Sequence, residues 1–233
     1  MNNNNSKINY KSLKISLIIN IIIVIFTIVA SIIMFTGFKF MESKDLLQSS
    51  KLGMFKFFTV DSNIFMGIVA LIFLIEEIKV LFHKKEDISY KLYILKLMAT
   101  SAVALTFFTV FGYLGLIVDG GYFAMITNSN LFFHLIIPLL SMLNFILFES
   151  TDKLKFKYSL FGVVPTLIYT LFYTINVLVH IENGQVSPRY DWYWFVQGGL
   201  WQIVIVLPVM LAVSYLISAL LLRFNRKVYK EVV

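Results

Sequence analysis

Six long apolar stretches constrain the fold of this chain more than any other feature of its sequence. They cover roughly residues 15–37, 57–80, 94–118, 131–149, 159–179 and 199–222. The hydrocarbon core of a bilayer is about 30 Å thick, so a helix needs about 20 mostly apolar residues to cross it. A helix also satisfies its own backbone hydrogen bonds where water is absent. We therefore predict an all-α, polytopic membrane protein, a bundle of six transmembrane helices.

Composition excludes a soluble globular domain. Of the 233 residues, 59% are hydrophobic and 14% are charged, whereas globular proteins have about 45–50% and about 25%. The chain has no cysteine, which excludes disulfides, thiolate metal sites and a cysteine nucleophile. It also lacks the motifs of nucleotide, haem and zinc sites. We therefore predict no cofactor and no metal.

The basic residues indicate the orientation of the bundle. Lys and Arg number 20 against 13 Asp and Glu, a formal net charge of +7. If the six stretches cross in alternate directions, fifteen basic residues share the side of the two termini and five lie on the other side. Because cytoplasmic loops carry an excess of Lys and Arg, both termini are predicted to be cytoplasmic. The membrane accounts for the positive charge, and we expect no nucleic-acid partner.

The chain is expected to form one transmembrane domain over residues 15–222, between a polar tail over 1–14 and a basic cytoplasmic tail over 223–233. Lys7, Lys11 and Lys14 precede the first apolar stretch, as in a signal peptide, but that stretch continues to Phe38. It is longer than the roughly 7–15 apolar residues of a signal peptide. We expect this helix to be retained.

Two polar clusters lie at the same predicted depth near the non-cytoplasmic side. Thr59 follows the start of the second stretch and His134 the start of the fourth. With a rise of about 1.5 Å per residue, each lies roughly 5–6 Å inside the boundary. Residues four apart share a helix face, which places Asn63 below Thr59 and Asn130 above His134. Asp61 faces elsewhere and is not expected to orient the histidine.

A threonine and a histidine at one depth suggest a nucleophile and its general base. This chemistry needs the two side chains within about 2.6–3.2 Å and a third group that orients the ring. The titration range of His134 suits a proton carrier. The alternative for Thr59 is a hydrogen bond to a preceding carbonyl or a neighbouring helix. For His134 it is a hydrogen-bonded helix contact.

The fifth stretch and the loop after it form a second polar region. Tyr169, Tyr173 and Asn176 follow one helix face, and the loop that follows is rich in Tyr and Trp around Arg189. Such a loop is typical of an aromatic belt at the lipid headgroups. The alternative is a lid over a lipid site, with Arg189 near a carboxylate or phosphate.

Charged residues near the cytoplasmic side are expected to snorkel to the interface. These residues are Glu76, Glu77, Lys79, His83 and Glu149.

Three segments resemble a known family. The stretch KFFTVDSN over residues 56–63, the pattern Asn130-x3-His134-x3-Pro138, and the tyrosine-rich fifth stretch with its aromatic loop resemble the bacterial Pr6Pr six-span membrane proteins. These are similar to the FAR-17a / androgen-induced-gene proteins of animals, membrane threonine hydrolases that cleave fatty-acid esters of hydroxy fatty acids. The resemblance covers nearly the whole chain. It implies a bacterial cytoplasmic membrane protein, with Thr59 as nucleophile and His134 as the catalytic histidine.

Our hypothesis from the sequence is an intramembrane lipid ester hydrolase, whose partners are membrane lipids and a lipid ester substrate. Asn63, Asn130, Tyr169, Tyr173 and Arg189 are candidates for binding or positioning that substrate. The alternative is a small carrier or scaffold whose polar residues only tie helices together. A carrier needs a polar path across the bilayer. The inner halves of the second and fourth stretches offer little beyond Ser141, Asn144 and the rim charges, which favours a one-sided site.

Overall fold

The computed structural model describes residues 9–42, 49–83, 87–196 and 199–232. It is mostly helical, as predicted from the sequence. The elements are α1 (Tyr10–Thr36), η1 (Lys51–Lys56), α2 (Phe58–Leu81), α3 (Tyr90–Thr109), η2 (Val110–Leu114), α4 (Gly115–Ile117), α5 (Gly121–Met125), η3 (Leu131–Ile136), α6 (Ile137–Leu143), η4 (Asn144–Phe148), η5 (Phe156–Val163), α7 (Val164–Val179), the strands β1 (Ile181–Glu182) and β2 (Gln185–Val186), and α8 (Gln202–Val232). Here η1 and η5 are 3-10 helices, and η2, η3 and η4 are π-helical segments.

Five helical segments of the described chain are long and apolar enough to cross a membrane. They are Tyr10–Thr36, Tyr90–Ile117, Leu131–Phe148, Phe156–Val179 and Gln202–Glu231. The remaining predicted stretch forms α2, which is not among these five but packs against both α1 and α3. Large apolar side chains also face outward, including Ile18, Ile25 and Ile32 of α1 and Ile168, Leu171 and Ile175 of α7. A helical bundle with an apolar exterior is suited to lipid, and six spans stay a prediction.

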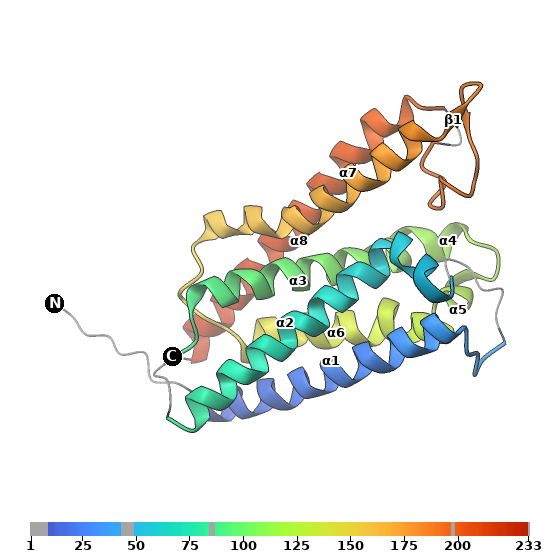
Figure 1. Cartoon of the computed structure of the whole chain (residues 1–233). Coiled ribbons are helices and arrows are strands. Elements are labelled where there is room, and N and C mark those ends of the chain that lie inside the picture. The colour runs from blue at the N-terminus through green and yellow to red at the C-terminus, as the bar shows by residue number, and fades with distance from the viewer. Residues whose placement is uncertain (1–8, 43–48, 84–86, 197–198, 233) are drawn as a thin grey trace.

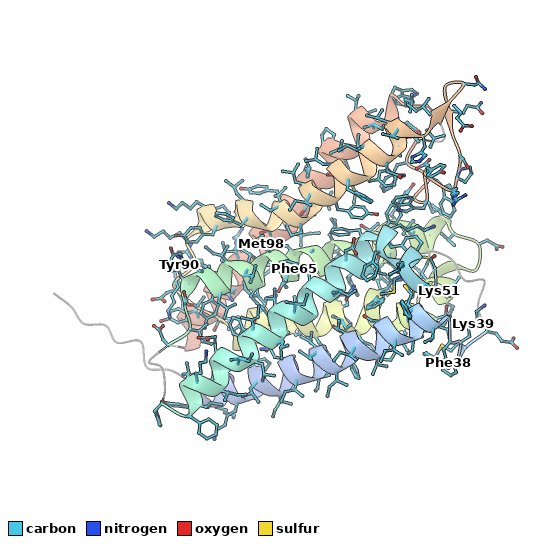
Figure 2. All side chains as sticks on the ribbon, viewed as in Figure 1. Phe38, Lys39, Lys51, Phe65, Tyr90 and Met98 are labelled. Atoms are coloured by element: carbon cyan, nitrogen blue, oxygen red, sulfur yellow. The ribbon has the colours of Figure 1, made fainter. Side chains whose placement is uncertain are left out.

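The two ends of the bundle are distinct. The start of α1 and the end of α8 lie at one end (Figure 1). Tyr90 lies toward that end, whereas Phe38, Lys39 and Lys51 lie together at the opposite end (Figure 2). We name the end with the start of α1 the inner end and the end with Lys39 the outer end, following the predicted orientation. The α7–α8 pair diverges from α1, α2 and α6 toward the outer end (Figure 1).

The boundaries of α1 follow from its capping residues. The Asn9 side chain accepts hydrogen bonds from the amides of Lys11 and Ser12, at 3.1 and 3.2 Å, and so caps the first turn. Gly37 ends the helix in the left-handed region, at φ 71°, where glycine has no Cβ penalty. The helix therefore begins at Tyr10, within the segment predicted as a polar tail.

A glycine allows α1 and α2 to cross closely. A Cβ at Gly67 of α2 would lie 2.7 Å from Cγ2 of Thr27 in α1. Only a residue without a side chain fits this approach, as is common where membrane helices pack on small residues.

The fourth predicted stretch is not a uniform α-helix. It runs as η3, α6 and η4, with π-helical winding on both sides of α6. One carbonyl in each π segment accepts a side-chain amide from another helix. Nδ2 of Asn63 in α2 donates to the Phe133 carbonyl at 3.0 Å, and Nδ2 of Asn225 in α8 donates to the Phe145 carbonyl at 2.5 Å. Amides from α2 and α8 thus hold the two ends of this segment.

The last helix continues well beyond the predicted boundary at residue 222. Asn225 is fully buried, and it binds the loop after η4 through the amide of Thr151 and the carbonyl of Glu149. Because these contacts hold Asn225 inside the bundle, α8 stays helical through the basic segment.

Candidate functional site

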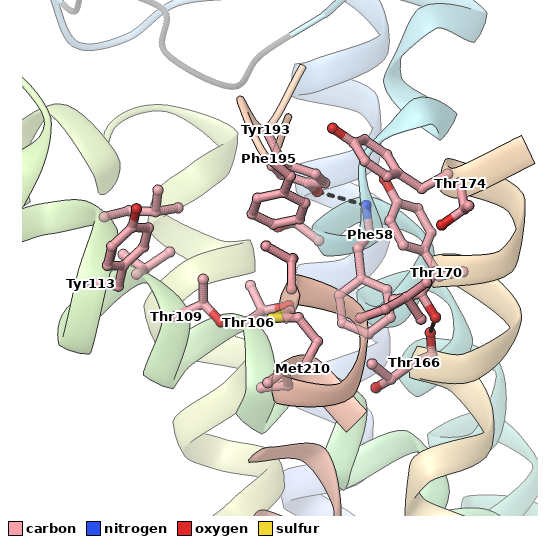
Figure 3. Close-up of a pocket in the computed structure, with 18 of the residues that line it drawn as sticks. Phe58, Thr106, Thr109, Tyr113, Thr166, Thr170, Thr174, Tyr193, Phe195 and Met210 are labelled. Carbon is pink, nitrogen blue, oxygen red and sulfur yellow. Dashed lines mark hydrogen bonds between the residues drawn. The ribbon is translucent and has the colours of Figure 1, made fainter. Parts of the chain in front are cut away.

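Thr59 lies in the wall of an outer pocket between α2, α3, α7 and α8. The space in this pocket that the centre of a water-sized sphere can occupy is about 70 Å³. Its lining is mostly apolar and includes Phe58, Leu105, Ile203, Val206, Leu207 and Met210. Phe195 also lines it, from the connection between α7 and α8, whose described residues 180–196 we name the outer loop. Thr106, Thr109, Thr166, Thr170, Thr174 and Tyr193 add hydroxyl groups around it (Figure 3). An apolar space with a few hydroxyls suits a lipid chain.

The hydroxyl of Thr59, like those of Thr109 and Thr174, differs from the hydroxyls of Thr106, Thr166 and Thr170 in this wall. Thr170 donates to the Thr166 carbonyl at 2.8 Å, and the Thr166 hydroxyl lies 2.9 Å from that of Ser214. The Thr106 hydroxyl lies 3.3 Å from that of Ser62. The Thr59 hydroxyl makes no hydrogen bond with any residue that the structure describes. Thr59 thus does not adopt the alternative arrangement, in which a membrane threonine bonds the preceding turn.

His134 is held in one orientation by the backbone. Its ring is buried in η3, and Nδ1 lies 2.5 Å from the carbonyl oxygen of Met125. A carbonyl can only accept, so Nδ1 carries the hydrogen and Nε2 is left as the basic nitrogen. The Met125 carbonyl is the orienting group that the sequence did not identify. Among the described residues, neither an acid nor an amide side chain fills that role.

No hydrogen bond joins Thr59 to His134 within the described residues, and His134 does not line the outer pocket. Their backbones are nevertheless linked through Asn63. Nδ2 of Asn63 donates to the Thr59 carbonyl at 2.7 Å and to the Phe133 carbonyl at 3.0 Å. Asn130 is buried at the start of η3, one turn before His134. The structure therefore brings the two chain segments together without joining the side chains of Thr59 and His134.

The outer loop folds back on the polar face of α7. The Tyr169 hydroxyl donates to the Lys56 carbonyl at 2.5 Å and accepts from Trp192 at 3.1 Å. The Tyr173 hydroxyl donates to the Asp191 carboxylate, and Asn176 donates to the Tyr190 carbonyl at 2.9 Å. Tyr169 and Tyr173 also line the pocket with their rings. These predicted positioning residues hold the loop over the pocket with their polar atoms.

Tyr193 and Asp191 complete the loop. The Tyr193 hydroxyl accepts from the Phe58 amide at 2.9 Å, next to Thr59 (Figure 3). Burial raises the pKa of Tyr193 to about 12. Asp191 accepts from the amides of Phe195 and Val196 at 2.9 and 3.1 Å. The pocket mouth is therefore bordered by a folded loop with satisfied polar groups.

Arg189 is exposed, with its guanidinium 5.7 Å from the ring centre of Tyr190, and it makes no ion pair within the described residues. Lys56 packs its ammonium over the rings of Phe57 and Trp192, at 4.9 and 5.8 Å. Burial, and then the charge of Arg189, lower the pKa of Lys56. Two cations therefore stand near the pocket mouth, where lipid headgroups would lie in the predicted orientation.

The inner half of the bundle contains a charged cluster, which corrects the expectation of snorkelling. Glu77 and Glu149 do not reach the interface but are 0% and 2% exposed. Lys96 is also fully buried and forms an ion pair with Glu149 at 2.9 Å. Asn20 of α1 lies at the centre of this group, because its Oδ1 accepts from Lys96 at 2.6 Å. Of the rim residues, Glu76 and Lys79 do pair near the surface, at 2.7 Å.

The sequence carried two signals for this cluster. Asn20 interrupts the apolar run of α1, and Lys96 lies nearly two turns inside α3, which begins at Tyr90. A lone polar residue deep in a span normally has a polar partner on a neighbouring helix. Those two positions therefore pointed to acids on the facing helices.

No protein-family model matches the chain, and neither a curated protein nor a solved structure does. The resemblance to the Pr6Pr proteins stays a prediction that rests on the quoted motifs.

Proposed function

We propose that this protein hydrolyses a lipid ester within the membrane, with Thr59 as nucleophile and His134 as general base. The observation that carries the proposal is the Thr59 hydroxyl, which lies in the wall of an apolar pocket and has no hydrogen bond to the described protein. The acyl chain of the substrate occupies the pocket, and its carbonyl lies beside Thr59. The resemblance to the animal threonine hydrolases supports the same pair of residues.

The reaction proceeds by acyl transfer. Nε2 of His134 accepts the Thr59 proton while Oγ1 attacks the ester carbonyl carbon, and the protonated ring then gives that proton to the departing alcohol. In the second half of the reaction, His134 takes a proton from water, and the water oxygen attacks the acyl carbon. The ring then returns that proton to Oγ1 of Thr59 as the acyl–threonine bond breaks and the fatty acid leaves. Catalytic hydrogen bonds often tighten only when substrate is bound, so this mechanism requires that substrate binding bring Oγ1 of Thr59 within reach of Nε2 of His134, while the Met125 carbonyl keeps the ring oriented. Asn63, which bonds both chain segments, positions the pair.

The test is fluorophosphonate labelling and ester hydrolysis by the purified protein in lipid nanodiscs. Thr59→Ala and His134→Ala are each expected to abolish labelling and hydrolysis, and the double variant to be hardly worse, because the two residues act as a unit. Thr59→Ser should retain partial activity. Thr170→Ala is the matched control, since Thr170 lies in the same wall but bonds its own helix. Full hydrolysis by Thr59→Ala would exclude the mechanism.

We also propose six spans in a bacterial cytoplasmic membrane, with both termini cytoplasmic. The distribution of Lys and Arg supports this orientation. In a chain without cysteine, single cysteines at Lys155 and Gly184 report the two sides directly. Impermeant labelling of intact cells should reach position 184 and not position 155. The reverse result would invert the topology and place Thr59 near the inner leaflet.

A small carrier is the second candidate function. The observation that favours it is the charged cluster of Glu77, Lys96 and Glu149, because it places polar groups in the inner half, where the sequence indicated few. Transport into proteoliposomes that is lost in Glu77→Gln but kept in Thr59→Ala would favour the carrier over the hydrolase.

A further inference from the structure

The charged cluster carries an unbalanced charge. Glu77, Glu149 and Lys96 are all at most 2% exposed, and they would contribute two negative charges and one positive charge if all were ionised. An uncompensated charge inside a protein is strongly unfavourable, and more so in a membrane. One further positive charge is therefore needed within the cluster.

The hydrogen bonds show which acid is ionised. Oε1 of Glu149 accepts from Lys96 at 2.9 Å and from three neutral side chains. These neutral donors are Asn144 at 2.8 Å, Asn20 at 3.1 Å and Ser16 at 3.2 Å. Four donors, one of them a cation, are suited to a carboxylate.

Glu77 has a different environment. Its Oε2 accepts a single neutral hydrogen bond, from Nδ2 of Asn20 at 3.0 Å. Its Oε1 is buried without a hydrogen-bond partner among the described residues, as is Oε2 of Glu149, so the two acids differ in the donors at their other oxygen. Lys96 forms its only ion pair within the described residues with Glu149. Within the described residues, Glu77 is thus the acid of the cluster that forms no ion pair, although the charge of Lys96 still acts on it.

We propose that Glu77 is a reversible proton-binding site in the inner half of the membrane domain. With one proton on Glu77, the cluster is neutral, since the charges of Lys96 and Glu149 cancel. The proton enters from the aqueous phase and needs no coordination shell. A metal cation needs several oxygen ligands, and the ammonium of Lys96 already occupies the place beside Glu149 and Asn20.

The surroundings of Glu77 contain few other charges. α1 contributes only the neutral Ser16 and Asn20. α3 contributes Lys96 and Tyr93, and the chain after η4 contributes Glu149.

Tyr93 of α3 lies near charged groups of both the cluster and the inner rim. It interacts electrostatically with Glu77 and Glu149 and also with Asp87 and Asp152. Asp87 is exposed and paired with Lys153 at 2.7 Å. Glu77 lies four residues before the end of α2 at Leu81, so the inner end is the nearer aqueous side for the proton. The site is separate from Thr59, which lies eighteen positions earlier on α2, about 27 Å along the helix.

The experiment measures protonated carboxyl groups by infrared difference spectroscopy on the full chain in nanodiscs. At neutral pH the wild type should show one carbonyl band of a buried, protonated carboxyl. The band should be lost in Glu77→Gln and retained in Glu76→Gln, the matched control on the neighbouring position. The wild-type melting temperature should fall as the pH is raised above about 4.3, the ordinary pKa of glutamate, because the unfolded chain releases the proton that the folded chain keeps. Glu77→Gln should remove this dependence.

Three results would overturn the proposal. A band that survives in Glu77→Gln but disappears in Glu149→Gln would move the proton to the other acid. A wild type without any protonated carboxyl would show that the cluster stays charged, and this measurement needs no variant to fold. A melting temperature that rises with sodium over choline, and no longer does so in Glu77→Gln, would assign a metal cation instead. None of these results depends on hydrolase activity.

Discussion

The outer and inner ends of this bundle bury polar groups in opposite ways. At the outer end the buried polar side chains of the helices are neutral, as His134 and Asn63 are, and both bind backbone carbonyls. The buried acid of the outer loop, Asp191, is bound by two backbone amides and by Tyr173. At the inner end the buried groups are charged and bind one another across α1, α2, α3 and the end of η4. The comparison separates two uses of polar residues in a membrane. The unbonded hydroxyl of Thr59 is available to react with a substrate, whereas the buried charges of Glu77, Lys96 and Glu149 must neutralise one another.

The largest expected effect is at the inner end. Lys96→Met removes the only cation of the cluster and leaves two acids buried, so we expect the free energy of unfolding to fall by about 3–5 kcal/mol. Thermal unfolding of the purified protein measures this loss. Lys91→Met, on the exposed face of the same helix, should have little effect. Equal losses in both variants would mean that the cluster does not stabilise the fold.

The outer loop should show an intermediate effect. Asp191→Ala removes a carboxylate that accepts from Tyr173 and from the amides of Phe195 and Val196. Since hydrogen bonds to charged groups contribute about 1.5–3 kcal/mol, we expect a loss in that range and faster proteolysis of the loop. Glu182→Ala changes an exposed acid of the same loop and is the control. Unchanged proteolysis in Asp191→Ala would show that other contacts hold the loop.

The neutral groups of the outer end should matter less for stability. Asn63→Leu removes two hydrogen bonds, and membrane hydrogen bonds contribute about 0.6 kcal/mol each on average. We expect a loss of about 1 kcal/mol in unfolding experiments. Thr59→Ala removes no hydrogen bond and should leave stability unchanged while abolishing hydrolysis. A strongly destabilised Thr59→Ala protein would contradict this distinction between the two ends.

The smallest effect concerns the two cations at the pocket mouth. Arg189→Gln removes the charge that, after burial, lowers the pKa of Lys56, so that pKa should rise. Burial still holds it below its ordinary value. A folded-state pKa below the unfolded one means that stability increases with pH across the interval between the two. This interval should narrow in Arg189→Gln, as followed by NMR titration of isotopically methylated lysines. An unchanged Lys56 titration would show that the charge of Arg189 does not affect the pKa of Lys56.

The helices could be predicted from the sequence because apolar length alone determines them. Predicted and observed boundaries agree within a few residues for the stretches that became α2, α7 and the 131–148 segment. The last helix was predicted too short, because Asn225 anchors it through contacts that lie far away in sequence.

Partners at the candidate sites were less predictable. The shared depth of Thr59 and His134 follows from spacing, but whether their side chains meet depends on how the helices are rotated. The acids of the inner cluster were assigned to the rim because each was considered on its own helix. Only the packing shows that Asn20 and Lys96 face Glu77 and Glu149.

The π-helical winding on both sides of α6 affects how the side chains of this segment are oriented. A π turn closes its hydrogen bonds one residue further along than an α turn, so each accommodates an additional residue in the same helix. His134 lies in one such turn and Asn144 in the other. Deleting one residue from either turn would restore ordinary α winding and rotate the neighbouring side chains by about 100°. The number of residues in this segment, as much as their identity, therefore determines the direction in which the side chains of His134 and Asn144 point.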